Sequence, residues 1–246
     1  MVVLDPTTLI NVLLIAISGT LVCIAVHFIP VGGAPAAMAQ ATGIGTGTVE
    51  LAAGSGLVGL ITASAMYAIP SVQADPNAMA LVLAAGAMGS MIMLASTMLA
   101  GSLVYAYGVG VPFASAQVKK DPITGARQDL YMSKGTQGQG LPTVCFVSGI
   151  IGAALGGIGG ALIYFVLVKI YATSALIGGS AAAVAGVFTM GVFYVNAVVP
   201  SYGVGGTIEG FHDPKFSRVI PKYALTSFVV SALCGILAIL IGGGLI

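Results

Sequence analysis

The sequence predicts an all-α integral membrane protein with about six transmembrane helices, and two observations carry this prediction. Of its 246 residues, 58% are apolar and only 6% are charged, whereas a soluble domain carries roughly 25% charged residues. The charged residues also leave six long uncharged runs, each exceeding the ~20 residues that an α-helix needs to cross the hydrocarbon core. A water-soluble globular protein is excluded, and the net charge of +1 leaves no basic face for nucleic acid.

We expect one multi-pass membrane domain over residues 1–246. Helices are expected rather than a barrel, because the uncharged runs show no apolar and polar alternation and because lipid requires internally satisfied backbone hydrogen bonds. The six spans are expected at about residues 9–28, 51–69, 79–107, 143–168, 173–199 and 223–241.

The positive charges predict the orientation of these spans. Seven of the eight Lys and Arg residues fall in the loops at about 108–142 and 200–222, which are therefore expected to be cytoplasmic. Because the number of spans is even, both termini are then expected outside the cell. The exception, Lys169, is expected to extend its ammonium group to the outer interface.

The chain contains short internal repeats that indicate a duplicated helical hairpin. Gly-Ala-Pro-Ala-Ala-Met-Ala-Gln at 33–40 resembles Gly-Val-Pro-Phe-Ala-Ser-Ala-Gln at 110–117, and Tyr-Gly-Val-Gly occurs at both 107–110 and 202–205. These repeats follow the first, third and fifth spans. We expect the three odd spans to run parallel and their exits to surround one cytoplasmic vestibule.

The fourth span carries Gly152, Gly156 and Gly160 at four-residue intervals. Small residues at this spacing let helix backbones approach closely in lipid, where burial of apolar side chains gives little drive for association. We expect this stripe to be a packing face. The general richness in small residues also predicts an obligate complex in which much of this helix surface meets other protein rather than lipid. Membrane lipids are expected as partners elsewhere on the surface.

The segment at 31–49 is uncharged but interrupted by six glycines and prolines, which predicts a re-entrant or broken helix. Such backbone is tolerated at membrane depth where it lines a wet cavity. Its glycine carbonyls, the hydroxyls of Thr46 and Thr48 and the carboxylate of Glu50 offer hard oxygens that suit a small cation. The alternative is an interfacial linker in which Thr48 caps the second span.

A second acid and both histidines also fall near the expected cytoplasmic ends of the spans. Glu209 and His212 lie in a glycine-rich motif whose ionisable groups are candidates for the ion path or for partner contact. The alternative is a solvated turn, since Asp213 precedes a proline. His27, at the end of the first span, is expected to anchor at the interface or to hydrogen-bond to nearby backbone.

The polar loop at 119–141 is a candidate docking surface. Arg127 and Lys134 are positioned to contact a soluble partner or an anionic small molecule, although its Gly-Thr-Gln-Gly-Gln-Gly run also fits a flexible tether. The chain has no nucleophile elbow, no H-E-x-x-H motif, no phosphate-binding loop and no corrinoid lower-ligand pattern. We therefore expect no catalytic residue and no directly bound cofactor in this chain.

Several longer motifs resemble a known family. They are VHFIPVGGAPAAMAQATGIGTGT at 26–48, DPITG at 121–125, RQDLY at 127–131, GLPT at 140–143 and GTIEGFHDP at 206–214. Their order and content resemble the D-subunit family of tetrahydromethanopterin S-methyltransferase from methanogenic archaea, over nearly the whole chain.

This resemblance implies a membrane-bound complex of methanogenesis. The complex transfers a methyl group from methyl-tetrahydromethanopterin to coenzyme M through a corrinoid, and it couples the transfer to outward sodium transport. It implies that the corrinoid rides on the A subunit and that the C and E subunits share the membrane sector. The cation candidates Glu209, Glu50, Thr46 and Thr48 then become candidates for a sodium path, and Arg127, Lys134 and His212 become candidates for partner contact.

Three functions remain open from the sequence. The first is a non-catalytic subunit that contributes to the sodium path of the methyltransferase. The second is a passive scaffold that completes the membrane sector while another subunit carries the ion. The third is an independent secondary transporter, which the internal repeat favours.

Overall fold

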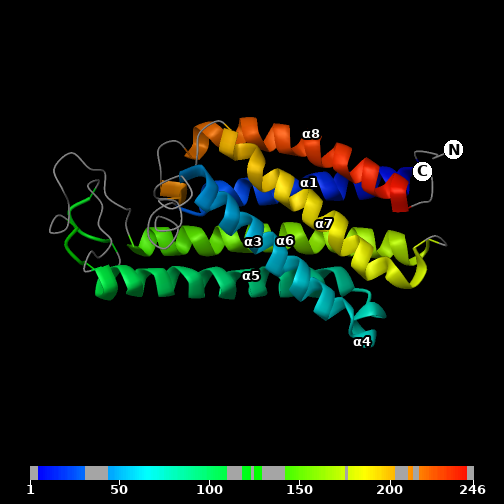
Figure 1. Cartoon of the computed structure of the whole chain (residues 1–246), viewed down its shortest axis with the longest axis horizontal. Coiled ribbons are helices and arrows are strands. Elements are labelled where there is room, and N and C mark those ends of the chain that lie inside the picture. Colours follow the sequence, from blue (N-terminus) through cyan, green and yellow to red (C-terminus); the bar gives the residue numbers. More distant parts are fainter. Residues whose placement is uncertain are drawn as a thin grey trace.

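The computed structural model contains six long helices that lie side by side in an elongated bundle (Figure 1). It describes residues 5–30, 44–109, 118–122, 125–128, 142–174, 177–202, 210–212 and 216–242. The six long helices are α1 (Pro6–Phe28), α3 (Ile44–Tyr67), α5 (Ala78–Leu103), α6 (Pro142–Ala172), α7 (Ala181–Val198) and α8 (Phe216–Gly242).

All six helices are long and apolar enough to cross a membrane. Together with the absence of strands from the described residues, this confirms the predicted fold class. Helices of 18 to 31 residues rise about 27 to 46 Å, which matches or exceeds a hydrocarbon core of about 30 Å. The architecture is that of a multi-pass membrane protein.

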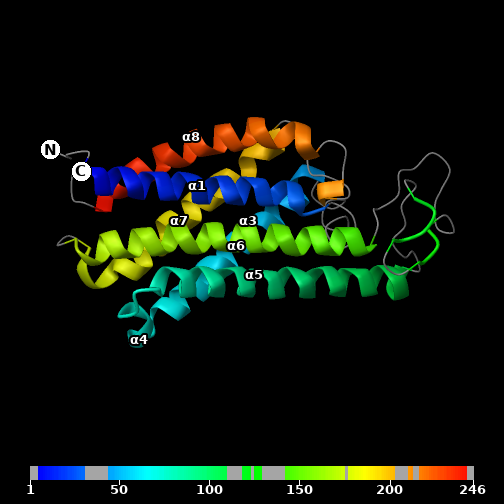
Figure 2. The ribbon, with the colours of Figure 1, turned by 180° about the vertical axis from the view of Figure 1, so that it is seen from behind.

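The helices alternate in direction, so α1, α5 and α7 run parallel and α3, α6 and α8 run the opposite way (Figures 1 and 2). We call the end of the bundle where α1, α5 and α7 finish the loop end, and the other the terminal end. The short elements at the loop end are a π-helical turn, η1 (Val104–Val109), and two 3-10 turns, η4 (Val199–Tyr202) and η5 (Gly210–His212). The terminal end carries α4 (Pro70–Gln73) and η3 (Gly178–Ser180).

Local sequence explains where the helices on the terminal side begin and end. Asp5 caps α1 by accepting a hydrogen bond from the Thr8 N–H at 2.8 Å. Hydrogen bonding from the Thr8 side chain, together with this backbone bond, lowers the pKa of the Asp5 carboxyl. Pro6 occupies the first helical position, where no backbone donor is needed. Helix α3 ends at Tyr67 on the terminal side, and α4 starts at Pro70. Ile69 between them is extended, because the residue before a proline is disfavoured in a helix.

The helix ends differ from the expected bounds, most clearly at the starts of α3, α7 and α8. Helix α7 begins at Ala181 rather than near 173, because α6 continues to Ala172 and the glycines after it form the turn η3. Helix α8 begins at Phe216 rather than at 223 and contains Pro221. That proline is tolerated because it lies close to the start of α8 and removes only one hydrogen bond, to a carbonyl of the first turn.

The segment at 31–49 is helical from Ile44 onward. The expected break is therefore wrong for residues 44–49, where the first turns of α3 engage the carbonyls of Gly45 and Gly47 in helical hydrogen bonds. The rest of this segment lies outside the described residues. So do the repeated motifs at 33–40 and 110–117.

Helix α6 is the centre of the bundle and packs against α1, α3, α5 and α7 (Figure 2). A Cβ on Gly152 would lie 2.8 Å from Ile29 Cγ1 at the end of α1, and one on Gly156 would lie 2.8 Å from Ser55 Cβ of α3. A Cβ on Gly160 would meet the backbone of Gly56 closer than 3.0 Å, which real Cβ atoms essentially never show. The three glycines of the predicted stripe thus lie directly against α1 and α3.

Glycines also let α5 pack closely against α6. This contact does not involve the stripe of Gly152, Gly156 and Gly160. Gly157 of α6 faces Gly86 of α5 and Gly59 of α3 through backbone atoms, with no room for a side chain. Glycines of α6 therefore contact α1, α3 and α5 on successive sides of the helix. Backbone contact of this kind maximises dispersion attraction between helices in lipid.

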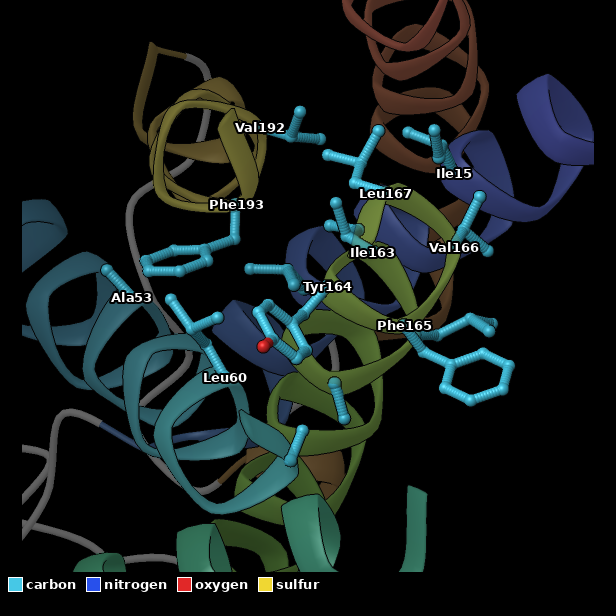
Figure 3. Close-up of a cluster of buried hydrophobic side chains, with 14 of the residues drawn as sticks. Ile15, Ala53, Leu60, Ile163, Tyr164, Phe165, Val166, Leu167, Val192 and Phe193 are labelled. Carbon is cyan, nitrogen blue, oxygen red and sulfur yellow. The ribbon is translucent and has the colours of Figure 1, made fainter. Parts of the chain in front are cut away.

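Larger side chains fill the space beyond the glycines. Ile163 and Leu167 of α6 pack with Phe193 of α7, Leu60 of α3 and Ile15 of α1 around the second half of α6 (Figure 3). All five are buried. The core therefore changes along α6 from backbone contact near the loop end to interlocking side chains near the terminal end.

Hydrogen bonds between helices supplement this packing. Ser90 Oγ of α5 donates to the Ser55 carbonyl of α3 at 2.7 Å, and Tyr171 Oη of α6 donates to the Ala238 carbonyl of α8 at 2.9 Å. Between α7 and α8, Ser227 Oγ donates to Asn196 Oδ1. Such bonds average about 0.6 kcal/mol in membrane bundles, so they fix the register more than they supply stability.

The glycine contacts generate a stability prediction. Gly160→Ala places a Cβ against the backbone of Gly56, which cannot yield as a flexible side chain can, and should cost about 1 to 3 kcal/mol. The measurement is the apparent melting temperature of the detergent-solubilised chain. Gly191→Ala is the matched control, because nothing lies within 4 Å of its Cβ position; it should leave the melting temperature unchanged or raise it. Equal effects of both substitutions would contradict the packing role.

Candidate functional site

The predicted site residues converge on the loop end, as far as they are described. Glu50 lies near the start of α3, and the backbone of His212 lies in η5. Arg127 is exposed in the segment between α5 and α6. Lys134 and Glu209 lie outside the described residues, so the distance between the two predicted acids stays untested.

Glu50 is exposed, while its neighbours Val49 and Leu51 are buried. It lies on the outer face of α3, at the edge of the apolar span Val49–Tyr67. Among the described residues, it is the one carboxylate inside a helix long enough to cross a membrane. Within the same described part, no three His, Cys, Asp or Glu side chains come together as a metal site.

The backbone of α3 also places the two predicted threonines. Thr46 and Glu50 are separated by one helical turn, whereas Thr48 lies two residues from each and falls on a different side of α3. The three residues therefore do not share one helical face. The backbone of α3 places Thr46 and Glu50 on one side of the helix and Thr48 on another.

Ser148 of α6 organises the loop end, and the sequence prediction did not identify it. Its buried Oγ donates to the Phe28 carbonyl of α1 at 2.5 Å and accepts from the Phe211 N–H at 3.0 Å. One hydroxyl thus joins the end of α1 to the motif that carries Glu209 and His212. A serine in a glycine-rich helix gave no signal of this role, because it depends on a tertiary contact.

Gly210 and Phe28 complete this junction. Gly210 has φ +58°, a conformation that favours glycine, and a Cβ there would collide with Ser148 Oγ and Cβ. The Phe28 ring lies 6.5 Å from the Phe211 ring and 4.7 Å from the Phe216 ring, the latter edge to face. The backbone of η5 is therefore held against α1, α6 and the start of α8.

The second feature of the loop end is an antiparallel bridge between Lys120 and Arg127, which joins the described segments 118–122 and 125–128. Asp121 is buried and accepts a hydrogen bond from Thr143 Oγ1 at the start of α6, at 2.8 Å. Gly125, with φ +71°, closes the turn through its N–H to the Asp121 carbonyl at 2.9 Å. Asp121, the first residue of the DPITG motif, is thus tied to α6, and Lys119, Lys120 and Arg127 are exposed nearby.

His27 is buried and is not a surface ligand. Its Nδ1 lies 3.2 Å from the Cys23 carbonyl, and its ring lies 5.7 Å from the Tyr223 ring. This confirms the expected hydrogen bond to nearby backbone. The imidazole therefore helps to pack α1 against α8 rather than facing a partner.

The charges of the described residues are divided between the two ends of the bundle. Lys119, Lys120, Arg127, Arg218 and Lys222 belong to the loop end. Lys169 is exposed in the last turn of α6 at the terminal end, with its Nζ 5.3 Å from the centre of the Phe165 ring. Its exposure agrees with the expectation that this side chain extends to the interface.

Comparison with known proteins identifies the family. Residues 8–231 match the family described as the D subunit of tetrahydromethanopterin S-methyltransferase. The chain belongs to this family. It is 55% identical over 235 residues to the D subunit of Methanosarcina barkeri, covering 92% of this chain and 91% of the relative.

Relatives from other methanogens agree with this assignment. The D subunit of Methanothermobacter thermautotrophicus is 53% identical over 237 residues, with 95% of this chain and 97% of the relative covered. That of Methanocaldococcus jannaschii is 53% identical over 224 residues, with 91% and 93% covered. The resemblance stated from the motifs is confirmed, and the chain is related to one component of a methyltransferase complex.

The Ser148 junction generates a prediction about this D-subunit fold. Ser148→Ala removes the acceptor of the Phe211 N–H, a loss of about 1 kcal/mol. Hydrogen exchange at the Phe211 amide should therefore become about fivefold faster. Ser96→Ala is the matched control, because this exposed serine bonds to the Ile92 carbonyl of its own helix. An unchanged Phe211 exchange rate would contradict the junction.

Proposed function

We propose that this chain is a non-catalytic membrane subunit of a sodium-translocating methyltransferase complex and that it contributes to the sodium path. In this proposal the methyl group passes from methyl-tetrahydromethanopterin to coenzyme M through a corrinoid held by the A subunit. The C and E subunits complete the membrane sector. Membership of the D-subunit family supports the assignment to the complex.

The single observation that carries the sodium role is the position of Glu50. A carboxylate in a membrane-capable helix is costly and marks a functional site by default, and this one lies at the loop-end edge of its span. It is exposed on the outer face of α3. The proposed path therefore runs along the boundary between this chain and a neighbouring subunit.

The packing of α6 also favours a sodium path at the boundary between this chain and a neighbouring subunit. Gly157 and Gly160 contact the backbones of α5 and α3 with no room for even one carbon atom between them. A hydrated or partly hydrated sodium ion does not fit between these helices without their separation. Within the described residues, an outer face is thus the route that leaves the glycine contacts intact.

Charge-neutralising variants test the sodium role. In the assembled complex reconstituted into vesicles, Glu50→Gln and Glu209→Gln should each lower sodium uptake about tenfold, the effect of losing ~1.4 kcal/mol of cation binding. Methyl transfer measured without a sodium gradient should fall less. Asp75→Asn is the control, since Asp75 lies at the terminal end and accepts from the Asn77 N–H. Unchanged uptake in both glutamate variants would contradict the site.

A scaffold role is the second candidate. Large apolar side chains are exposed along α5 and α8, for example Ile92 at 65% and Leu225 at 68%, and such faces suit contact with lipid or other membrane subunits. A scaffold predicts that substitutions on these faces lose assembly and never uncouple methyl transfer from sodium uptake. A Glu50→Gln complex that still transfers methyl groups but no longer takes up sodium would contradict the scaffold role.

The proposed orientation places the loop end in the cytoplasm. Lys120→Cys should react with a membrane-impermeant maleimide only after intact cells are permeabilised, whereas Thr173→Cys should react from outside. Both positions are exposed. Of the native cysteines, Cys23 and Cys145 are buried and Cys234 is half-buried inside α8. The reverse labelling pattern would contradict the orientation and the direction of the ion path.

A further inference from the structure

A groove lies between the end of α7 and the start of α8 at the loop end. Its volume is about 660 Å³, and its walls are mostly apolar. Val195, Val198 and Val199 line it from the α7 side, and Tyr223 and Lys222 line it from α8. The groove opens to the outside of the bundle, and neither the proposed ion path nor the Ser148 junction uses it.

The position of the groove across the membrane follows from helix geometry. Lys222 precedes Gly242, the last residue of α8, by twenty positions, which corresponds to about 30 Å of helix, the thickness of the hydrocarbon core. Lys222 therefore lies at the boundary between hydrocarbon and headgroups when α8 spans the membrane. Arg218 lies one turn farther out on the same face.

Lys222 places one positive charge in the lining of the groove, and Arg218 places a second one helical turn away. Arg218 and Lys222 are both exposed, and neither forms an ion pair with any residue in the part of the chain that the structure describes. The Lys222 ammonium instead lies 6.0 Å from the centre of the Tyr223 ring. The start of α8 adds the partial positive charge of a helix N-terminus a few residues away.

We propose that this groove binds an anionic membrane lipid. The headgroup phosphate lies against Arg218 and Lys222, and the first part of the hydrocarbon chain lies along the valines of α7. Phosphate pairs well with both a guanidinium and an ammonium group, and basic pockets between transmembrane helices on the cytoplasmic side are typical of such binding. The inference does not depend on the sodium role.

The groove suits a lipid better than a partner helix. It occupies only the first turns of α8, from Lys222 to Thr226, whereas a transmembrane helix would need a continuous contact through the bilayer. A partner helix in the groove would also need an acidic residue at the headgroup boundary, opposite Lys222, to supply the complementary charge. A lipid supplies the negative charge and the short apolar segment in one molecule.

The test uses the purified, delipidated complex and native mass spectrometry. The probes are phosphatidylglycerol, phosphatidylcholine and inorganic phosphate, titrated separately. We expect phosphatidylglycerol to bind more tightly than the other two. The double variant Arg218→Gln and Lys222→Gln should weaken its binding about fivefold for each cation lost.

Two further variants separate charge from packing. Val195→Trp fills the groove while both cations remain, and it should also abolish phosphatidylglycerol binding. Lys119→Gln with Lys120→Gln removes two exposed charges of the loop end outside the groove and should leave binding intact. If the Gln double variant fails to assemble, Arg218→Lys with Lys222→Arg keeps both charges and should retain binding.

The outcomes that overturn the proposal are distinct. Equal affinity for phosphatidylcholine would remove the role of the cations, and competition by inorganic phosphate at equal concentration would remove the role of the groove. A crosslink from Val195→Cys to a helix of another subunit, with no lipid bound, would replace the lipid by a protein partner. Unchanged phosphatidylglycerol binding in Val195→Trp would also overturn it.

Discussion

Close backbone contact around α6 is the constraint on which the rest of the structure depends. Lipid tails are as apolar as leucine, so burial of apolar side chains gives little drive for helix association, and the helices must gain from close packing instead. Gly157 contacts Gly59 of α3 and Gly86 of α5 at once. A single Cβ at that position would separate three helices.

The same contacts position the loop end. Gly152 lets α1 approach α6 so closely that a Cβ there would lie 2.9 Å from Phe28 Cβ. Only with α1 at this distance can Ser148 Oγ of α6 reach the Phe28 carbonyl. Since that hydroxyl also accepts from the Phe211 N–H, the motif around Glu209 and His212 is attached to the bundle through the glycine packing.

Features that depend on composition and periodicity were predictable from the sequence. The six spans follow from the scarcity of charges, and the packing role of Gly152, Gly156 and Gly160 follows from their spacing. The ends of the helices were not predictable in the same way. Gly45 and Gly47 have poor helix propensity, yet Ile44–Tyr67 is one helix, which begins before the apolar span Val49–Tyr67.

The same distinction applies to the residues of the candidate site, some of which were predictable from the sequence and some of which were not. Glu50 was identifiable because its carboxylate ends a long uncharged run and follows residues that also offer oxygen ligands. Ser148 and Gly210 were not, because their roles arise only when α6, the end of α1 and η5 meet. A hydroxyl that bonds across two elements has no signature in local sequence, whereas a charge at the edge of a membrane span does.

The distribution of charge and packing together limits where an ion can move. The interior around α6 is closed by backbone contacts at Gly157 and Gly160. Between α7 and α8, Ser227 donates to Asn196, while the buried Ser231 Oγ of α8 has no hydrogen-bond partner among the described residues. Glu50 instead faces outward from α3. An ion that uses this carboxylate therefore needs a second surface to complete its coordination, since one exposed carboxylate supplies too few oxygen ligands. Under the proposed sodium role, the requirement for that second surface gives a physical reason for the chain to act beside a neighbouring subunit.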